Sequence, residues 1–332
     1  MAENITPKKP AQTSKGSSFF KTVLQQRELT IFLSVLGFAA LLALSSPNFL
    51  NRANLIALLV GLSFDMIVAV GMTILMVSGG FDMSVGSTLA LAGAVAGYSI
   101  TKYGAPIWLG IVLGLLTGVV IGLINGLLIT KIRVNPFIAT LGMMQVVRGI
   151  VFLVTSGLGI PNLPDGFNYF GQEKLLGLQI PVWIMLVLVV VGEILLRRWS
   201  FFRQSYFVGG NERSARLSGI NIDLVKITNY VIVGVMAAVS GLLLAGRMGT
   251  ASVSAGMNAE LRVISAVVIG GASLAGGEGS VLGSLLGVLL MALLANGLNL
   301  LGINVYWQTI VTGTVLVIAV AADAINRRRS GG

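Results

Sequence analysis

The sequence predicts an all-α polytopic membrane protein with about ten transmembrane helices. Of its 332 residues, 55% are hydrophobic and only 10% are charged, and the mean hydropathy is +0.91. A soluble domain carries about 25% charged residues. Long apolar runs with few charges, such as 106–130 and 310–322, have the composition of bilayer-spanning helices or of parts of them. These observations predict an integral membrane protein.

Hydropathy and turn residues divide the chain into ten predicted spans. The first five cover residues 29–45, 53–77, 84–101, 106–130 and 136–156. The last five cover residues 179–197, 223–246, 258–275, 280–300 and 305–325. Together they form one transmembrane domain, 29–325, between an N-terminal tail at 1–28 and a short tail at 326–332. An alternative count of six long spans with re-entrant segments keeps the same loops on the same faces.

The Lys and Arg residues separate between the two sides of this topology. Sixteen share one face: Lys8, Lys9, Lys15, Lys21, Arg27, Lys131, Arg133, Arg197, Arg198, Arg203, Arg213, Arg216, Lys226, Arg327, Arg328 and Arg329. Five lie on the other face: Arg52, Lys102, Lys174, Arg247 and Arg262. Because cytoplasmic loops carry the excess of Lys and Arg, the first face is predicted to be cytoplasmic, with both termini on it. The net charge of +10 therefore reflects topology, and no nucleic-acid partner is expected.

Glycine recurs at every fourth position along the predicted span at 106–130. These residues are Gly110, Gly114, Gly118, Gly122 and Gly126. Inside a bilayer the hydrophobic effect does not drive helices together, so small residues that let two backbones approach closely become the usual contact. The pattern predicts a helix-packing face. A sliding or pore-lining surface is the alternative.

A short internal repeat is also present. Ser78-Gly79-Gly80 followed by Gly86-Ser87 has a counterpart in Ala275-Gly276-Gly277 followed by Gly283-Ser284, at the same offset. Duplicated halves are common in transporters, with the substrate path between them.

Several residue types and motifs on which catalysis and metal binding often depend are missing from the sequence. It has no histidine and no cysteine, which excludes disulfides, Cys/His metal sites and catalysis by those side chains. It also has no G-x-x-x-x-G-K-[ST] loop for the phosphates of ATP, and its acidic residues do not form an evident carboxylate pair. We therefore predict that this chain is not an enzyme and binds neither a metal nor a cofactor.

Asp65 and Arg148 are the charges nearest the middle of the predicted bilayer. Both are expected at about half depth, within reach of one another if their spans are neighbours. Intramembrane charges are functional candidates, often with a partner, so Asp65 is the predicted partner of Arg148. A purely structural pair, or an Arg148 bonded to helix carbonyls, is the alternative. Four further polar residues can line a hydrophilic path or join helices by hydrogen bonds: Asn125, Thr140, Gln145 and Asn296.

A charged segment at 199–221 interrupts the apolar sequence on the predicted cytoplasmic side. Asn211 can cap a short helix with Glu212 in its first turn, and Gly219 supplies a C-terminal stop. Ala215 and Leu217 are then able to dock in a groove of a partner, although an ordinary solvated loop helix is the alternative. The stretch consists of Gly209, Gly210, Asn211, Glu212, Arg213, Ser214, Ala215, Arg216, Leu217, Ser218, Gly219 and Ile220.

Four stretches of the chain, 69–87, 135–149, 209–220 and 268–280, resemble the permease subunits of bacterial ABC sugar importers in the ribose/arabinose/galactose/autoinducer-2 family. The resemblance extends over residues 29–325. It implies a ten-helix permease of the cobalamin-importer type in a bacterial inner membrane, translocating a sugar or sugar-like solute. It also implies that 209–220 is the coupling loop that docks on the ATPase. Family members often have Glu-Ala-Ala in that loop, where this chain has Arg213-Ser214-Ala215.

The same resemblance implies a set of partners. These are a second permease subunit, identical or different, two ABC ATPase subunits that bind ATP and Mg²⁺, and a periplasmic or lipid-anchored sugar-binding protein. Membrane lipid surrounds the permease. The alternative function is an ion-gradient-driven secondary transporter of a small polar solute. It would require more buried carboxylates or a histidine relay and would not need a docking helix.

Overall fold

The computed structural model describes residues 27–330. The predicted tail at 1–28 therefore lies almost entirely outside the described residues, as do residues 331–332. The long helices are α2 (Arg27–Ser45), α3 (Arg52–Val77), α4 (Val85–Tyr103), α5 (Ile107–Thr130), α6 (Pro136–Thr155), α8 (Ile180–Arg198), α11 (Ile222–Met248), α13 (Val281–Leu300) and α14 (Val305–Ser330). The short elements are α7 (Asp165–Gln172), β1 (Lys174–Leu175), β2 (Leu178–Gln179), α9 (Ser200–Gly210), α10 (Glu212–Leu217) and α12 (Ala259–Ile269). The antiparallel hairpin β1–β2 sets Lys174 opposite Gln179.

Within the described part of the chain, seven helices are long and apolar enough to cross a membrane: α2, α3, α5, α6, α8, α11 and α13. These seven confirm seven of the ten predicted spans. Two more predicted spans, 84–101 and 305–325, are occupied by helices α4 and α14. Helix α14 continues to Ser330, so most of the predicted tail at 326–332 is helical.

The predicted span at 258–275 is wrong in length. Helix α12 has 11 residues, which is about 16 Å at 1.5 Å per residue and about half of a hydrocarbon core of roughly 30 Å. A non-helical segment, 249–258, leads into it from the end of α11. The segment from 249 to 280 nevertheless runs from one end of the bundle to the other, because the end of α11 lies against Gly171 of α7 and Gly277 lies against Gly209 of α9. It is therefore a broken span with a short helix and not a re-entrant loop.

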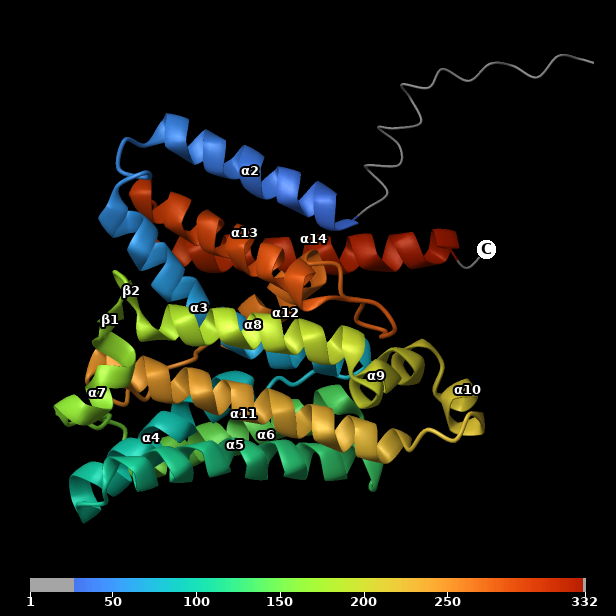
Figure 1. Cartoon of the computed structure of the whole chain (residues 1–332), viewed down its shortest axis with the longest axis horizontal. Helices are drawn as coiled ribbons and strands as arrows, with labels where there is room; N and C mark the ends of the chain where they lie inside the picture. Colours follow the sequence, from blue (N-terminus) through green and yellow to red (C-terminus); the bar gives the residue numbers. More distant parts are fainter. Residues whose placement is uncertain (1–26, 331–332) are drawn as a thin grey trace, which may run out of the picture.

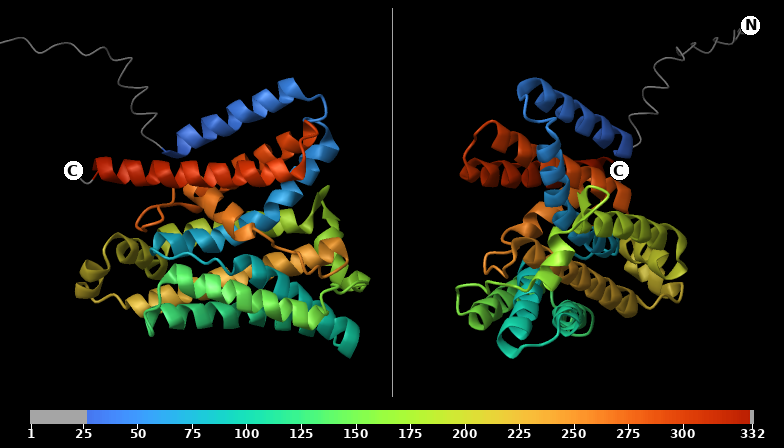
Figure 2. Two further views of the ribbon diagram at one scale, coloured as in Figure 1. Left: turned by 180° about the vertical axis from the view of Figure 1, so that it is seen from behind. Right: turned by 60° about the vertical axis from the view of Figure 1, so that its left-hand side comes forward.

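Helix α3 forms the centre of the bundle. Nearly every residue from Val60 to Val77 is buried, and the helix contacts α8, α11, α12 and α13. A helix that is apolar on every side is expected in a core position. In Figures 1 and 2, α2, α13 and α14 lie on one side of α3, and α4, α5 and α6 lie on the other.

The five glycines of α5 lie against α4 and α11. A Cβ atom at Gly118 would stand 2.3 Å from the carbonyl oxygen of Gly234, and one at Gly122 would stand 2.4 Å from that of Tyr230. At Gly114 the same atom would meet Leu242 and the Ala92 carbonyl. The backbones are therefore in contact, and in the structure this stripe is a helix-packing face with no room for a path along it.

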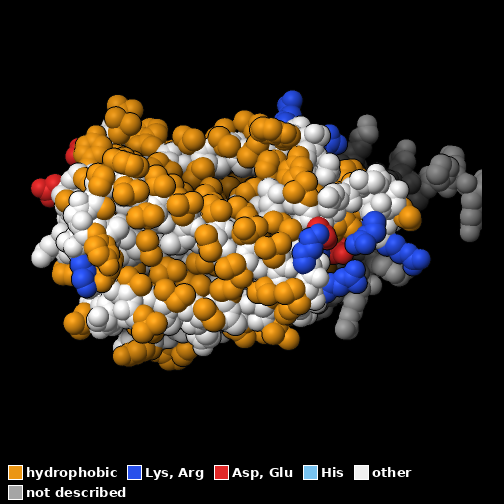
Figure 3. All heavy atoms as spheres, turned by 90° about the horizontal axis from the view of Figure 1, so that it is seen from below, with side chains coloured by type: hydrophobic (Ala, Val, Ile, Leu, Met, Phe, Trp, Pro, Cys, Tyr) orange, Lys and Arg blue, Asp and Glu red, His pale blue; other side chains and the backbone are white. Residues whose placement is uncertain are grey.

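The two ends of the bundle carry different elements. Helices α9 and α10 lie at the end where α2 begins and α14 finishes, whereas α7 and the β1–β2 hairpin lie at the opposite end (Figure 1). The surface between the ends is covered with hydrophobic side chains, and Lys and Arg side chains gather at the ends (Figure 3). This distribution is that of a bundle whose long axis crosses a bilayer.

Candidate functional site

The charged segment at 199–221 folds into the two short helices α9 and α10. Asn211 caps α10, because its side-chain oxygen accepts a hydrogen bond of 2.9 Å from the backbone N–H of Ser214. Gly219, with φ of 82°, ends the helix. Its N–H bonds to the carbonyl of Arg216, and the N–H of Ile220 bonds to that of Ala215, which is the Schellman arrangement. Both ends of this one-turn helix are thus fixed by its own residues.

The surface of α10 differs from the predicted docking surface at one position. Ala215 is 3% exposed and packs with Val208, Ile222 and Val225. It faces the protein, so the expectation that it docks into a partner groove is wrong. Leu217 is 84% exposed, and Glu212 forms an ion pair with Lys226 of α11. The free face of α10 therefore presents Leu217 among charged side chains.

A junction of glycine backbones joins α9 to two other parts of the fold. A Cβ atom at Gly209 would lie 2.0 Å from the Val77 carbonyl oxygen and 2.5 Å from the Gly277 nitrogen. A Cβ atom at Gly276 would lie 2.8 Å from the Gly79 nitrogen. Gly79 and Gly276 occupy matching positions in the internal repeat, so the two copies meet in space directly beneath α9.

Side-chain hydrogen bonds reinforce this junction. The amide of Asn229, which is fully buried in α11, donates to the hydroxyls of Ser78 and Ser205 at 3.0 Å each. The hydroxyl of Tyr206 in α9 donates to the carbonyl of Gly279 at 2.7 Å. These bonds tie α9 to the end of α3, to α11 and to the loop before α13.

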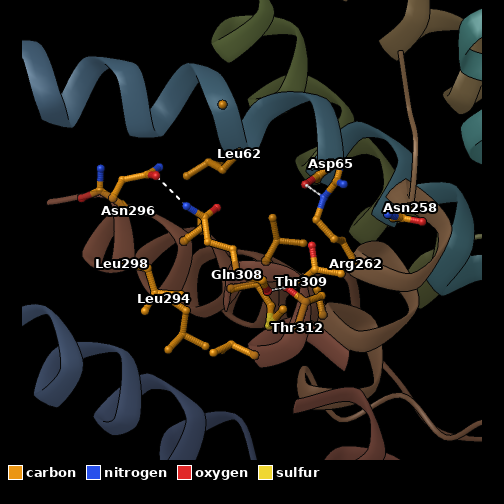
Figure 4. A pocket seen from close by; sticks show the side chains of 18 of the residues that line it. Leu62, Asp65, Asn258, Arg262, Leu294, Asn296, Leu298, Gln308, Thr309 and Thr312 are labelled. Carbon is orange, nitrogen blue, oxygen red and sulfur yellow. Dashed lines mark hydrogen bonds and ion pairs between the residues drawn. The ribbon is translucent and has the colours of Figure 1, made fainter. Parts of the chain in front are cut away.

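A second polar site lies in a cavity of about 610 Å³ among α3, α12, α13 and α14. Asp65 on α3 and Arg262 on α12 lie at one end of the cavity, and Asn296 on α13 lies toward the other (Figure 4). The Asp65 carboxylate accepts two hydrogen bonds from the Arg262 guanidinium, each 3.2 Å long. Asn296 exchanges amide hydrogen bonds with Asn54 at 2.7 and 3.2 Å.

The predicted pairing of Asp65 with Arg148 is wrong. Arg148 donates from Nη1 to the carbonyl oxygens of Val253 and Ala255, at 2.9 and 3.0 Å. Both carbonyls belong to the non-helical segment before α12, whose backbone has no helical partners. An arginine at that depth satisfies carbonyls that lipid cannot. Arg148 thus bonds to backbone carbonyls, as the alternative proposed, although they lie in a loop and not in a helix.

The other predicted path residues are dispersed. Asn125 is fully buried on α5 and donates to Asp82 at 3.2 Å and to Ser84 at 3.0 Å. Burial raises the pKa of the Asp82 carboxyl, although hydrogen bonds from Ser84 and Asn125 act in the opposite direction. Thr140 is buried and donates to the carbonyl of Pro136. Gln145 is exposed on the outer surface of α6. Of the six, only Asp65 and Asn296 share the cavity.

The sequence reasoning did not single out Arg262, Asn258, Tyr206 and Asn229 as functional residues. The sequence counts Arg262 among the charges of the non-cytoplasmic face, because it lies near the start of the predicted span at 258–275. Tyr206 and Asn229 occur in stretches with no marked composition, and their bonds depend on which helices are neighbours. The structure breaks this span instead: the chain turns at Gly249 and Gly256, both with positive φ, and Arg262 then lies in the first turn of α12 beside Asp65.

Comparison with known proteins places these features in a family context. A family model described as a branched-chain amino acid transport system / permease component matches residues 54–320. The chain is 40% identical over 324 residues to the ribose import permease protein RbsC of Escherichia coli (strain K12), covering 94% of this chain and 98% of the relative. It is 40% identical to RbsC of Bacillus subtilis (strain 168), covering 94% and 97%.

A third relative extends the comparison to another sugar. The chain is 34% identical over 314 residues to the L-arabinose transport system permease protein AraH of Escherichia coli (strain K12), with 95% of each chain covered. No solved structure matches the chain. These findings confirm the resemblance drawn from the four sequence stretches.

Proposed function

The chain belongs to the family described as permease components of branched-chain amino acid transport systems, and we propose that it is the transmembrane subunit of an ABC importer for a sugar or sugar-like solute. The observation that carries this proposal is the near-full-length similarity to ribose and L-arabinose permeases. Among solutes handled by this family, these relatives favour a sugar over a branched-chain amino acid. The sequence has no P-loop, so in this proposal ATP is hydrolysed by a partner subunit.

The α9–α10 unit is the proposed docking site for that partner, an ABC ATPase subunit. It is the small helical unit at the end of the bundle that carries the described chain ends (Figure 1). Leu217 supplies an apolar contact that is 84% exposed, and Arg213 and Arg216 beside it are exposed as well. A central apolar residue with a polar rim is typical of a protein interface.

The remaining partners follow from this assignment. The end with α9 and α10 faces the cytoplasm of a bacterial inner membrane, with both chain termini on that side, and the end with α7 and the hairpin receives a periplasmic or lipid-anchored sugar-binding protein. A second permease subunit completes the path across the bilayer. ATP and Mg²⁺ are bound by the ATPase subunits and not by this chain.

The mechanism that fits this geometry is a passive gate. Closure of the ATPase subunits on ATP displaces α10, and α9 transmits the movement because its backbone lies against Val77 and Gly277. The hydrogen bonds of Tyr206 and Asn229 carry the same displacement to the loop before α13 and to α3. Helices α3 and α13 also border the polar cavity.

Co-purification and reconstitution test the proposal. The tagged chain is expected to retain ATPase subunits, and proteoliposomes with those subunits and a sugar-binding protein are expected to import sugar only with ATP. Leu217→Asp should release the ATPase subunits without changing thermal stability. Leu158→Asp, at a loop leucine that is 90% exposed between α6 and α7, is the matched control and should retain them. Uptake by the isolated chain under a proton or sodium gradient would instead favour the secondary transporter.

A further inference from the structure

We propose that the cavity among α3, α12, α13 and α14 is a binding site for one neutral, multiply hydroxylated solute of monosaccharide size. This inference rests on the proposed function and assigns a place for the solute within the chain. The cavity measures about 610 Å³, within the range of about 300–1,000 Å³ that is typical of small-molecule sites. Its residues come from the half of α3 nearest the α7 end of the bundle, so it lies on the side from which the solute would arrive.

The ion pair at one end of the cavity indicates that the solute is uncharged. The Arg262 guanidinium donates to Asp65 through Nε and Nη2 and to the Met257 carbonyl through Nη1, at 3.2, 3.2 and 3.0 Å. The pair is neutral as a unit, and a charged solute would have to break it. Each carboxylate oxygen keeps a lone pair that can accept a hydrogen bond from a hydroxyl group. The Asp65 side chain is 30% exposed and that of Arg262 39%, so both remain accessible.

Amide groups continue the polar lining away from the ion pair. Asn296 is bonded to Asn54, and Gln308 donates to Asn299 at 2.6 Å. Asn258 stands in the left-handed backbone region, with φ of 58°, and makes no capping hydrogen bond to the described part of α12. Paired amides retain spare acceptor positions. These neutral amide groups lie apart from one another, so each can bond to a different hydroxyl group of one solute.

The rest of the wall is apolar. Leu58, Leu62, Met291 and Leu294 line it, and such side chains can contact the C–H faces of a sugar ring. A lipid acyl chain would use only this wall and would leave the ion pair and the amides without a function. The acceptor positions that these pairs leave open can bond to the hydroxyl groups of a solute and not to an acyl chain, so the composition of the cavity favours a hydroxylated solute over lipid.

Cysteine labelling tests the site directly, because the sequence contains no cysteine. The purified full chain in nanodiscs carries one reporter, Thr309→Cys, in the cavity wall. A control chain carries Leu158→Cys in the exposed loop. A small water-soluble maleimide is applied with D-ribose, L-arabinose or L-leucine. We expect a pentose at about twice its Kd to slow labelling of the cavity reporter about threefold, since the rate falls as 1 + [L]/Kd, and to leave the control unchanged.

Three results would overturn the inference. One is labelling that no pentose slows, and another is protection by L-leucine alone, which would indicate an amino-acid site. The third is a reporter that stays unlabelled in nanodiscs but becomes reactive in lipid-free detergent, which would indicate lipid in the cavity.

A plug variant provides the second measurement. Gly61 lines the cavity, and a Cβ atom there would meet nothing within 4 Å, so Gly61→Phe can fill the space without distorting α3. Gly37→Phe on α2 is the matched control, because Gly37 is equally open and does not line the cavity. Gly61→Phe should abolish pentose protection and ATP-driven uptake, and Gly37→Phe should preserve both.

The two measurements separate the inference from the proposed function. Normal ATP-driven uptake by the Gly61→Phe variant, together with no pentose protection, would reject the site and leave the importer assignment intact. Pentose protection in a chain that supports no ATP-driven uptake would reject the importer assignment and leave the site intact.

Discussion

Arg262 of α12 donates from Nε and Nη2 to the two carboxylate oxygens of Asp65 on α3, at 3.2 Å each, across 197 positions of sequence. This bidentate geometry fixes the start of the short helix α12 against the central helix of the bundle. It also places the two charges in the wall of the 610 Å³ cavity. Asp65 and Arg262 thus hold two helices together and are also candidates for contact with the solute.

The first prediction concerns the coupling between these two residues. In a double-mutant cycle, Asp65→Ala and Arg262→Ala should show an interaction of about 1 kcal/mol, since both side chains are about a third exposed and the pair is partly screened. The measurement is thermal unfolding of the four proteins in nanodiscs. The matched cycle combines Asp65→Ala with Arg148→Ala, which share no contact, and should be additive. Coupling between Asp65 and Arg148 would contradict the structure.

The pairing also shows what sequence alone can and cannot predict about this fold. Hydropathy located seven long helices, because each must cover a bilayer with apolar side chains. The depth of a charge within a span follows from counting residues, and Asp65 and Arg148 were placed at similar depth for that reason. Which spans are neighbours does not follow from depth. Arg262 became the partner because a broken segment brings it inward, and hydropathy averaged over 258–275 concealed that break.

Arg148 supplies the second prediction. Arg148→Ala removes the donors for the carbonyls of Val253 and Ala255, and should lower the stability of the chain by roughly 1–3 kcal/mol, the cost of buried acceptors left without a donor. Arg148→Lys should recover only part of this loss, because one ammonium cannot match the planar guanidinium. Thermal unfolding measures both. Gln145→Ala, at an exposed position of the same helix, should be near neutral, and an equal loss there would refute the role of the carbonyls.

The third prediction compares two glycines that both lie in helices. Gly118→Ala should destabilise the bundle by about 1–3 kcal/mol, because the new Cβ would stand 2.3 Å from the Gly234 oxygen and α5 and α11 would have to separate. Gly142→Ala on α6 meets nothing within 4 Å and should leave stability unchanged or slightly higher. Thermal unfolding distinguishes them. Equal tolerance at both positions would show that the glycine stripe is not a tight contact.

The charged segment was the part of the site that local sequence rules predicted best. The cap by Asn211 and the stop at Gly219 both depend on residues within one turn, so residue type was sufficient. The burial of Ala215 was missed because it depends on α9 and α11, which fold over that face. The junction of Gly209 with Gly79 and Gly276 was missed for a similar reason. The internal repeat marked two of these glycines without showing that they meet.

The last prediction tests whether α9 transmits movement. Tyr206→Phe removes the 2.7 Å hydrogen bond to the Gly279 carbonyl but keeps the ring in place. Stability should fall by only about 1 kcal/mol, and the ATPase subunits should still bind, because the free face of α10 is untouched. ATP-driven uptake in proteoliposomes should fall severalfold while ATP hydrolysis continues, so that more ATP is consumed for each solute imported. Tyr169→Phe, at an exposed position of α7 at the opposite end of the bundle, is the control and should preserve the ratio. An unchanged ratio in the Tyr206 variant would mean that the stroke reaches the core by the backbone junction at Gly209 alone.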